Sequence, residues 1–247
     1  MARRHDIDDL LRSWPYQPGE ISVRLVKARG GRDVLQMRVE MGVIQLETEH
    51  RPDGWRPEGA ETYFDYLLAL SIHAGDDFVL TDEQCAEADR EFMQFYQRRI
   101  CWLALREFRR AVRDADHNLG FMDFIRHCSP NEEWTASHEQ YRPFVLFHRT
   151  QAEALAELDE VGPEAAIEVL TRGMDEMREV CQQLDVEAAF EDEEMIERLA
   201  ELRESLRDRY EVGQTLHEQL ADAVGHEDYE RAARLRDEIA RRKPRRA

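Results

Sequence analysis

The amino-acid sequence predicts a mainly α-helical chain of the α+β class, with a small β element near its N-terminal end. Three observations predict it. Apolar and polar residues alternate between residues 21 and 46, apolar residues recur at helical spacing after residue 57, and the last thirty residues form two short amphipathic segments around a tight turn. Charged residues make up 35% of the 247 residues, above the roughly 25% typical of globular chains, which favours long solvated helices.

The alternating region predicts a β-hairpin. Residues 21–28 form the first strand, Gly30 and Gly31 lie in the loop, and residues 34–41 form the second strand. The second strand is expected to place four residues on one face: Leu35, Met37, Val39 and Met41. After Gly42 the alternation shifts by one position, which a bulge or a strand break at Gly42 would explain.

The helical region begins near Pro57. Residues 60–72 are apolar nearly all round, which predicts a buried helix that ends at Gly75. Thr81 and Gln84 form a capping-box pattern, and the helix behind them could run as far as Gly120. Further helices are expected after Ser129-Pro130, at Ser137, and on either side of Gly162-Pro163.

The two helices around Gly162-Pro163 resemble a tetratricopeptide unit, with an irregular helical bundle as the alternative. Nine acids and two arginines in residues 185–204 mark a boundary. From Met195 on, apolar residues are spaced four, three and four apart, at Met195, Leu199, Leu202 and Leu206. They form either a coiled-coil-like seam or an amphipathic helix packed on the body. We therefore expect three segments: 1–75, a β-hairpin plus a buried helix; 76–186, a helical bundle or repeat-like body; 187–247, an acidic helix, a helical hairpin and a basic tail.

The C-terminal hairpin carries the most information. Leu216, Leu220 and Val224 are spaced four apart on one helix, Gly225 supplies a C-cap, and a second helix starts near Asp228. On the second helix the spacing places five residues on one face, with Leu235 beside it: Tyr229, Ala232, Ala233, Arg236 and Ile239. The paired alanines lack bulk, so they allow the two helix backbones to approach closely.

Most charges of the second helix have a local explanation. Four acid-first i,i+4 pairs are expected to add about 0.2–0.5 kcal/mol each: Glu227–Arg231, Glu230–Arg234, Asp237–Arg241 and Glu238–Arg242. Arg236 lies on the apolar face, outside these pairs. Its guanidinium either extends into solvent or meets a carboxylate on another surface.

Residues 215–243 resemble the UVR motif, the helical hairpin of the bacterial excision-repair proteins UvrB and UvrC and of the activator of the bacterial protein-arginine kinase. The matching residues include the leucines of the first helix, the Asp228-Tyr229-Glu230 step, the alanine pair and the Leu235-Arg236-Asp237 run. Tyrosine replaces the commoner phenylalanine at the aromatic position. The resemblance implies protein–protein contact, either with another protein or with a second copy of the hairpin.

Catalytic signatures are not found in the sequence. It contains no phosphate-binding Gly-rich loop with Lys, no G-x-S-x-G and no H-E-x-x-H, so we expect no catalytic residue, cofactor or metal, and no enzymatic activity. The four cysteines show no C-x-x-C spacing. A metal-dependent enzyme using Asp114 and His117, spaced i,i+3, is the alternative to be tested.

The sequence thus predicts a non-enzymatic adaptor or scaffold, with the contact made by eight hairpin residues: Leu216, Leu220, Tyr229, Ala232, Ala233, Leu235, Arg236 and Ile239. An accessory role in DNA damage recognition or nucleotide excision repair is the alternative. The net charge of −19 disfavours nucleic acid and anionic membranes except at the basic tail, residues 241–246. The basic N-terminus has no apolar run behind it, and no stretch approaches 18 apolar residues, so we expect a cytoplasmic protein with reduced thiols.

Overall fold

The computed structural model describes residues 6–182 and 189–242. The chain divides into two compact units, residues 1–152 and 153–247. The three segments expected from the sequence stay a prediction. Among the described residues, no helix combines the length and the apolar character needed to cross a membrane.

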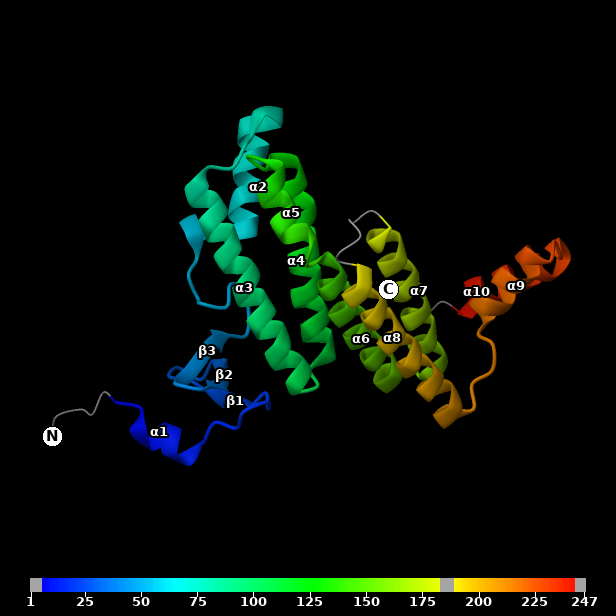
Figure 1. Ribbon diagram of the computed structural model, residues 1–247, viewed down its shortest axis with the longest axis horizontal. Coiled ribbons are helices and arrows are strands. Elements are labelled where there is room, and N and C mark those ends of the chain that lie inside the picture. Colours follow the sequence, from blue (N-terminus) through cyan, green and yellow to red (C-terminus); the bar gives the residue numbers. More distant parts are fainter. Residues whose placement is uncertain (1–5, 183–188, 243–247) are drawn as a thin grey trace. The chain divides into compact units, whose positions relative to one another are not determined.

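The first unit contains a small sheet and a group of helices (Figure 1). Its elements are α1 (Asp8–Ser13), β1 (Val23–Lys27), β2 (Asp33–Val39), β3 (Gly42–Glu47), α2 (Tyr63–Ala74), α3 (Asp82–Ala104), α4 (Phe108–Cys128), α5 (Glu132–Glu139) and the first part of α6 (Arg142–Glu160). Two short 3-10 turns, η1 (Pro57–Gly59) and η2 (Gly75–Asp77), flank α2. The mainly helical class with an N-terminal β element is confirmed.

The sheet has three antiparallel strands in the order β1-β2-β3, one more than the expected hairpin. Leu25, Leu35 and Leu46 lie opposite one another across the three strands. Val39 pairs with Gly42, so the chain reverses through the two residues between them. The predicted break at Gly42 is therefore confirmed as a turn, but Met41 is not part of the strand face, because it lies in that turn and is 91% exposed.

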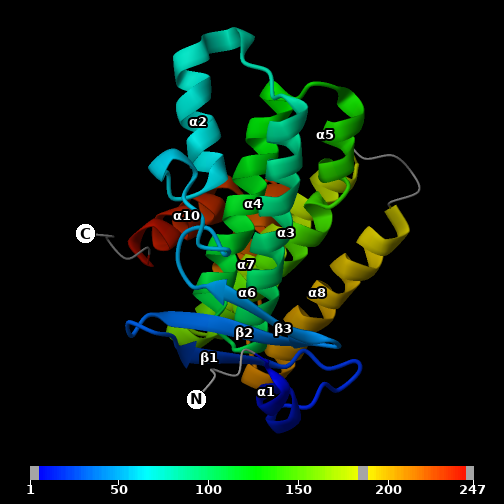
Figure 2. The ribbon, with the colours of Figure 1, turned by 90° about the vertical axis from the view of Figure 1, so that its left-hand side faces the viewer.

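The helices α3 and α4 lie side by side, and the sheet lies near one end of this pair (Figure 2). The predicted capping box is confirmed: Thr81 Oγ1 accepts from the Gln84 amide, and Gln84 Oε1 accepts from the Thr81 amide. The prediction of one helix ending at Gly120 is wrong. Helix α3 ends at Ala104, the backbone turns at Arg106, whose φ is 60°, and α4 then runs from Phe108 through Gly120 to Cys128.

Helix α2 packs against α4 near Gly120. A Cβ at Gly120 would lie 3.5 Å from the ring of Phe64, which is ordinary van der Waals contact, so this packing does not require a glycine. Phe64 stacks on Phe121 of α4 at 4.8 Å, and Phe121 stacks on Phe92 of α3 at the same distance. Helix α2 therefore shares one core with α3 and α4.

Helix α2 is half-buried, which differs from the buried helix expected. Tyr63 and Leu67 are buried, whereas Ile72 near its C-terminal end is 80% exposed. An all-round apolar pattern does not by itself reveal how many sides of a helix have neighbours. How much of α2 is buried depends on how many elements of the first unit pack against it.

A buried ion pair joins the helices to the sheet. Arg98 of α3, 1% exposed, forms two hydrogen bonds with the carboxylate of Asp114 of α4, at 2.9 and 2.7 Å. Its Nη1 donates to the carbonyl oxygens of Glu47, at the end of β3, and His50, at 3.2 and 2.7 Å. One guanidinium group therefore satisfies a buried carboxylate and two backbone carbonyls at once.

A second buried carboxylate holds the start of α2. Glu91 of α3 accepts hydrogen bonds from the amides of Tyr63 and Phe64, at 2.6 and 3.0 Å. Its Oε1 lies 3.0 Å from His117 Nε2, and its Oε2 lies 3.6 Å from Arg51 Nε. An acid at a helix N-terminus compensates the free amides and the positive end of the helix dipole.

The second unit contains the rest of α6, then α7 (Pro163–Cys181), α8 (Ala189–Tyr210), α9 (Leu216–Gly225) and α10 (Tyr229–Arg242). Helix α8 packs along α7 (Figure 1), and Leu199 and Leu206 are buried. The predicted leucine spacing thus belongs to an amphipathic helix packed within its own unit. The likeness of the α6–α7 pair to a tetratricopeptide unit stays a prediction.

We predict that Asp114→Asn destabilises the first unit by about 3–5 kcal/mol, because it leaves the Arg98 cation buried without a counter-charge. Asp116→Asn is the matched control, since Asp116 pairs with Arg149 at 2.5 Å and its side chain is 51% exposed. The control should cost less than about 1 kcal/mol. Urea unfolding measures both, and equal losses in the two variants would contradict the role given to the buried pair.

Candidate functional site

The C-terminal hairpin begins with a capping box on α9. Thr215, 3% exposed, accepts a hydrogen bond from the Glu218 amide at 3.3 Å. Glu218 Oε2 in turn accepts from the Thr215 amide at 2.8 Å. The pair satisfies two free amides and fixes where the helix starts. The sequence pattern T-x-x-E could have indicated this start, as the similar pattern at Thr81 did.

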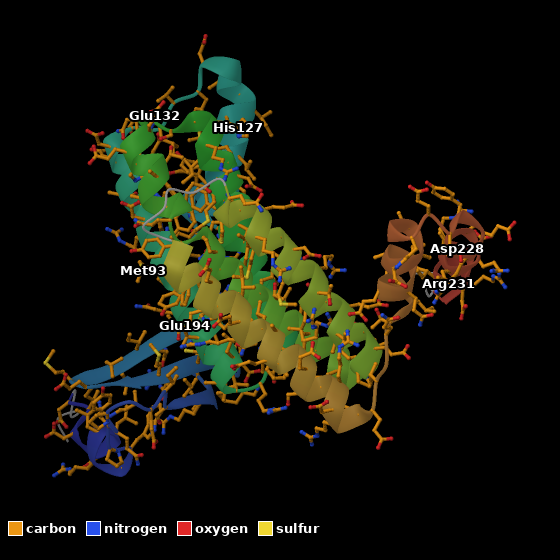
Figure 3. The ribbon with its side chains drawn as sticks, turned by 45° about the vertical axis from the view of Figure 1, so that its right-hand side comes forward. Met93, His127, Glu132, Glu194, Asp228 and Arg231 are labelled. Carbon is orange, nitrogen blue, oxygen red and sulfur yellow. The ribbon has the colours of Figure 1, made fainter. Side chains whose placement is uncertain are left out.

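The turn between α9 and α10 lies close to its predicted place. Gly225 is the last residue of α9, but the left-handed conformation expected of it belongs to Glu227, whose φ is 57°. The Asp228 amide donates to the carbonyl of Ala223 at 2.8 Å, and the Asp228 carboxylate accepts from the Arg231 amide at 3.0 Å. Figure 3 shows Asp228 and Arg231 on this hairpin. Asp228 therefore starts α10 by capping it.

The interior of the hairpin is small. Ala223, Ala232 and Leu235 are buried, and Leu216 and Leu220 pack against them. Ile239 is half-buried at the end of the same face. The sequence predicted that an alanine would allow the two helices to approach closely. Ala232 has this role, since it is buried between them. Five of the eight predicted contact residues therefore hold the hairpin together.

The other three predicted contact residues face outward. Tyr229 is 69% exposed, and Ala233 and Arg236 are also exposed. Together with Ala240 they follow one another at intervals of four, three and four residues, so they form a stripe along α10 that we call the outer stripe. The structure thus separates the predicted single face into an interior row and an outer stripe.

Arg231 and Arg241 of α10 take partners that differ from the expected Glu227 and Asp237 carboxylates. Arg231 lies 4.0 Å from Asp222 of α9, across the hairpin, and Arg241 Nε donates to the backbone carbonyl of Asp237 at 3.3 Å. Arg236 pairs with its neighbour Asp237 at 2.9 Å, and the Arg236 side chain is 71% exposed. Such a pair contributes little because both groups are solvated, so the Arg236 guanidinium can exchange this partner for another.

The start of α9 is tied to the helices that precede it in the second unit. Arg207 of α8 donates to the Gly213 carbonyl at 2.7 Å and also pairs with the Glu218 carboxylate. His217 Nδ1 lies 2.7 Å from Glu168 Oε1 of α7. These contacts use side chains of the first turn of α9 and leave the outer stripe of α10 uncovered.

The metal site considered for Asp114 and His117 is not assembled. Asp114 is bound by Arg98, and His117 lies against Glu91 and stacks on Phe95 with ring centroids 3.5 Å apart. Within residues 6–182 and 189–242, no three His, Cys, Asp or Glu side chains gather in a way that could hold a metal ion.

One Ser-His-Asp contact, not noticed in the sequence, lies in the first unit. His138 Nε2 is 3.0 Å from Asp89, and its Nδ1 is 3.3 Å from Ser137 Oγ. However, Ser137 Oγ donates to the Trp134 carbonyl at 2.7 Å, and His138 Nδ1 lies 3.0 Å from the same carbonyl. A ring nitrogen that donates to a carbonyl cannot accept the serine proton, so the arrangement is a helix-end contact rather than an activated nucleophile.

Comparison with known proteins identifies the same segment. Residues 214–242 match the family described as the UvrB/uvrC motif, which confirms the UVR resemblance for this hairpin. No curated protein sequence and no solved structure matches the chain.

We predict that Leu235→Ala selectively loosens the hairpin. Leu235 is 8% exposed in an interior of few residues, so truncation should cost about 2 kcal/mol of local stability. Hydrogen exchange of the α9 and α10 amides measures this loss. Tyr229→Ala, on the outer stripe, should change the same protection by less than about 0.5 kcal/mol. Similar losses in both variants would contradict the assignment of inner and outer rows.

Proposed function

We propose that this protein is a non-enzymatic adaptor that binds another protein through the outer stripe of its C-terminal hairpin. The observation that carries the proposal is the division of the hairpin residues. The leucines and Ala232 are occupied with the interior, whereas Tyr229, Ala233 and Arg236 are exposed and have no role in it. The match of this segment to the UvrB/uvrC motif supports a role in protein contact.

The chemistry of the outer stripe suits a protein interface. Tyrosine and arginine are the residues most often found at the energetic centre of interfaces, because each offers a large flat group with a polar end. Ala233 lies between them and has no bulk, so a partner backbone can approach α10 closely there. Arg236 can form a paired hydrogen bond with a partner carboxylate in place of its exposed contact with Asp237.

The energetics of the hairpin favour association. Few of its side chains are buried, and each large apolar side chain contributes only about 1.5–3 kcal/mol when it is fully buried. Ordering a residue costs about 1.5 kcal/mol, so a segment of this length gains little stability from its interior alone. A partner that covers Tyr229 would therefore stabilise the hairpin while binding to it.

The proposal is tested by what co-purifies with the protein. The intact chain and a chain ending at Val212 serve as baits in a cell extract, and mass spectrometry identifies proteins that bind only the intact chain. The double variant Tyr229→Ala/Arg236→Glu should then reduce recovery of those proteins by at least about tenfold, as expected for two central interface residues.

A matched control uses an exposed tyrosine and an exposed arginine outside the hairpin. Tyr141 is 58% exposed and the Arg12 side chain is 72% exposed. The variant Tyr141→Ala/Arg12→Glu should recover the partner as the unchanged chain does. Equal recovery by the intact chain and the chain ending at Val212 would refute the proposal.

The second candidate is an accessory role in DNA damage recognition or excision repair. The basic residues between 241 and 246 favour it, since they stand at the end of a chain with a net charge of −19. Residues 243–247 lie outside the described part of the chain. If the tail contacts DNA, a gel shift at low salt should show binding that weakens steeply with added salt and disappears when residues 241–247 are removed. A protein that shifts no DNA at low salt does not contact DNA through this tail.

A further inference from the structure

The first unit contains a polar cleft that the hairpin proposal does not use. Its volume is about 550 Å³, and it lies where the end of β3, the loop leading to α2 and the first turn of α4 meet. Figure 2 shows the sheet and this loop. The side chains that matter for its chemistry are Arg32, Glu47, Arg51, Trp55, Arg56 and Arg110.

The carboxylates on the lining of the cleft are already paired with cations. Glu47 binds Arg32 at 3.0 Å. Asp33 pairs with Lys27 at 2.7 Å, and Glu49 pairs with Arg113 at 2.9 Å. Their negative charge is therefore largely compensated, and they present little repulsion to an anion in the cleft.

Arg51 belongs to the lining but is buried. The residue is 0% exposed, and its Nε and Nη2 contact Gln94, Asp53 and Glu87, with Glu91 Oε2 3.6 Å from Nε. Its Nη1 has no hydrogen-bond partner, but this atom is buried too, so a ligand in the cleft does not reach it. Arg51 therefore contributes to the cleft through the residues that it holds in place.

Two other arginines of the lining, Arg56 and Arg110, can donate hydrogen bonds to a ligand in the cleft. Arg56 is exposed and forms no ion pair with any residue that the structure describes. Arg110 lies 3.7 Å from Glu107, beyond a close hydrogen bond, and its guanidinium carbon lies 4.6 Å from the Trp102 ring centroid. Several guanidinium groups thus line one cleft of a chain that is acidic overall.

An aromatic ring completes the lining. The Trp55 indole is 48% exposed, and its ring centroid lies 4.7 Å from the guanidinium carbon of Arg51. A half-exposed indole held in place by a buried cation is a rigid surface on which a flat ring can stack.

We propose that this cleft binds a phosphate ester that carries a flat ring. The phosphate oxygens accept from Arg56 and Arg110, because guanidinium groups match the geometry of phosphate oxygens. The ring stacks on Trp55. Asp53, Glu87 and Glu91 around Arg51 reduce the local positive potential, so we expect a dissociation constant between micromolar and millimolar.

The test uses phenyl phosphate, inorganic phosphate and phenol as probes of the full chain at constant ionic strength. The Gly54 amide lines the cleft and serves as the nuclear magnetic resonance reporter, since it exists in every variant. We expect saturable binding of phenyl phosphate, weaker binding of inorganic phosphate, and no saturable binding of phenol at the same concentrations.

Matched variants assign the contacts. Arg56→Gln should weaken phenyl phosphate binding by about three- to tenfold, as expected for the loss of one charge-assisted hydrogen bond. Arg12→Gln, an exposed arginine of α1 outside the cleft, should leave binding unchanged. Trp55→Leu should remove the preference for phenyl phosphate over inorganic phosphate. The same spectra report whether each variant is folded.

Three results would overturn the proposal. A Gly54 shift that rises linearly with any salt shows that no site exists. Equal affinities for Arg56→Gln and the unchanged chain remove the arginine contact, and an unchanged preference for phenyl phosphate in Trp55→Leu removes the stacked ring. Because the hairpin is not involved in these measurements, their failure leaves the adaptor proposal untouched.

Discussion

The buried contact between Arg98 and Asp114 is the interaction on which the first unit depends. A guanidinium group at 1% exposure is costly unless each of its donors finds an acceptor, and here the acceptors come from α4 and from the end of β3. The same contact fixes the backbone of Glu47 and His50, and both residues line the polar cleft. The position of the cleft thus follows from how one buried cation is satisfied.

The hairpin is subject to a different constraint, because its two helices bury few side chains between them. Its two helices are defined by good local chemistry: a capping box at Thr215, an aspartate cap at Asp228 and a small residue at Ala232. These features specify its shape more than they stabilise it, because few side chains become buried. Tyr229 and Arg236 are then left outside, at a site where association with another surface would supply the missing burial. A hairpin that has a defined shape but few buried side chains is consistent with a segment that binds another surface.

The two candidate sites differ in how they could be found. The hairpin is local in sequence, so periodicity, caps and a family resemblance were sufficient to locate it. The cleft combines residues from Arg32 to Arg110, and its essential features are the gathering of Arg56, Arg110 and Trp55 and carboxylates whose partners are distant in the sequence. Neither feature has a pattern in the sequence, because ion-pair partners such as Glu49 and Arg113 are 64 positions apart.

The sequence by itself determined the helical class, the N-terminal strands, the capping box at Thr81 and the two short C-terminal helices, since each depends on residues within one or two helical turns of each other. Only the tertiary structure decided that α3 ends at Ala104, that α2 is half-buried, and that Tyr229 and Ala232 lie on different sides of α10. The physical reason is that burial and ion pairing depend on which neighbours a side chain has. Helical periodicity orders the faces of a helix, but the packing of the whole unit decides which face is covered.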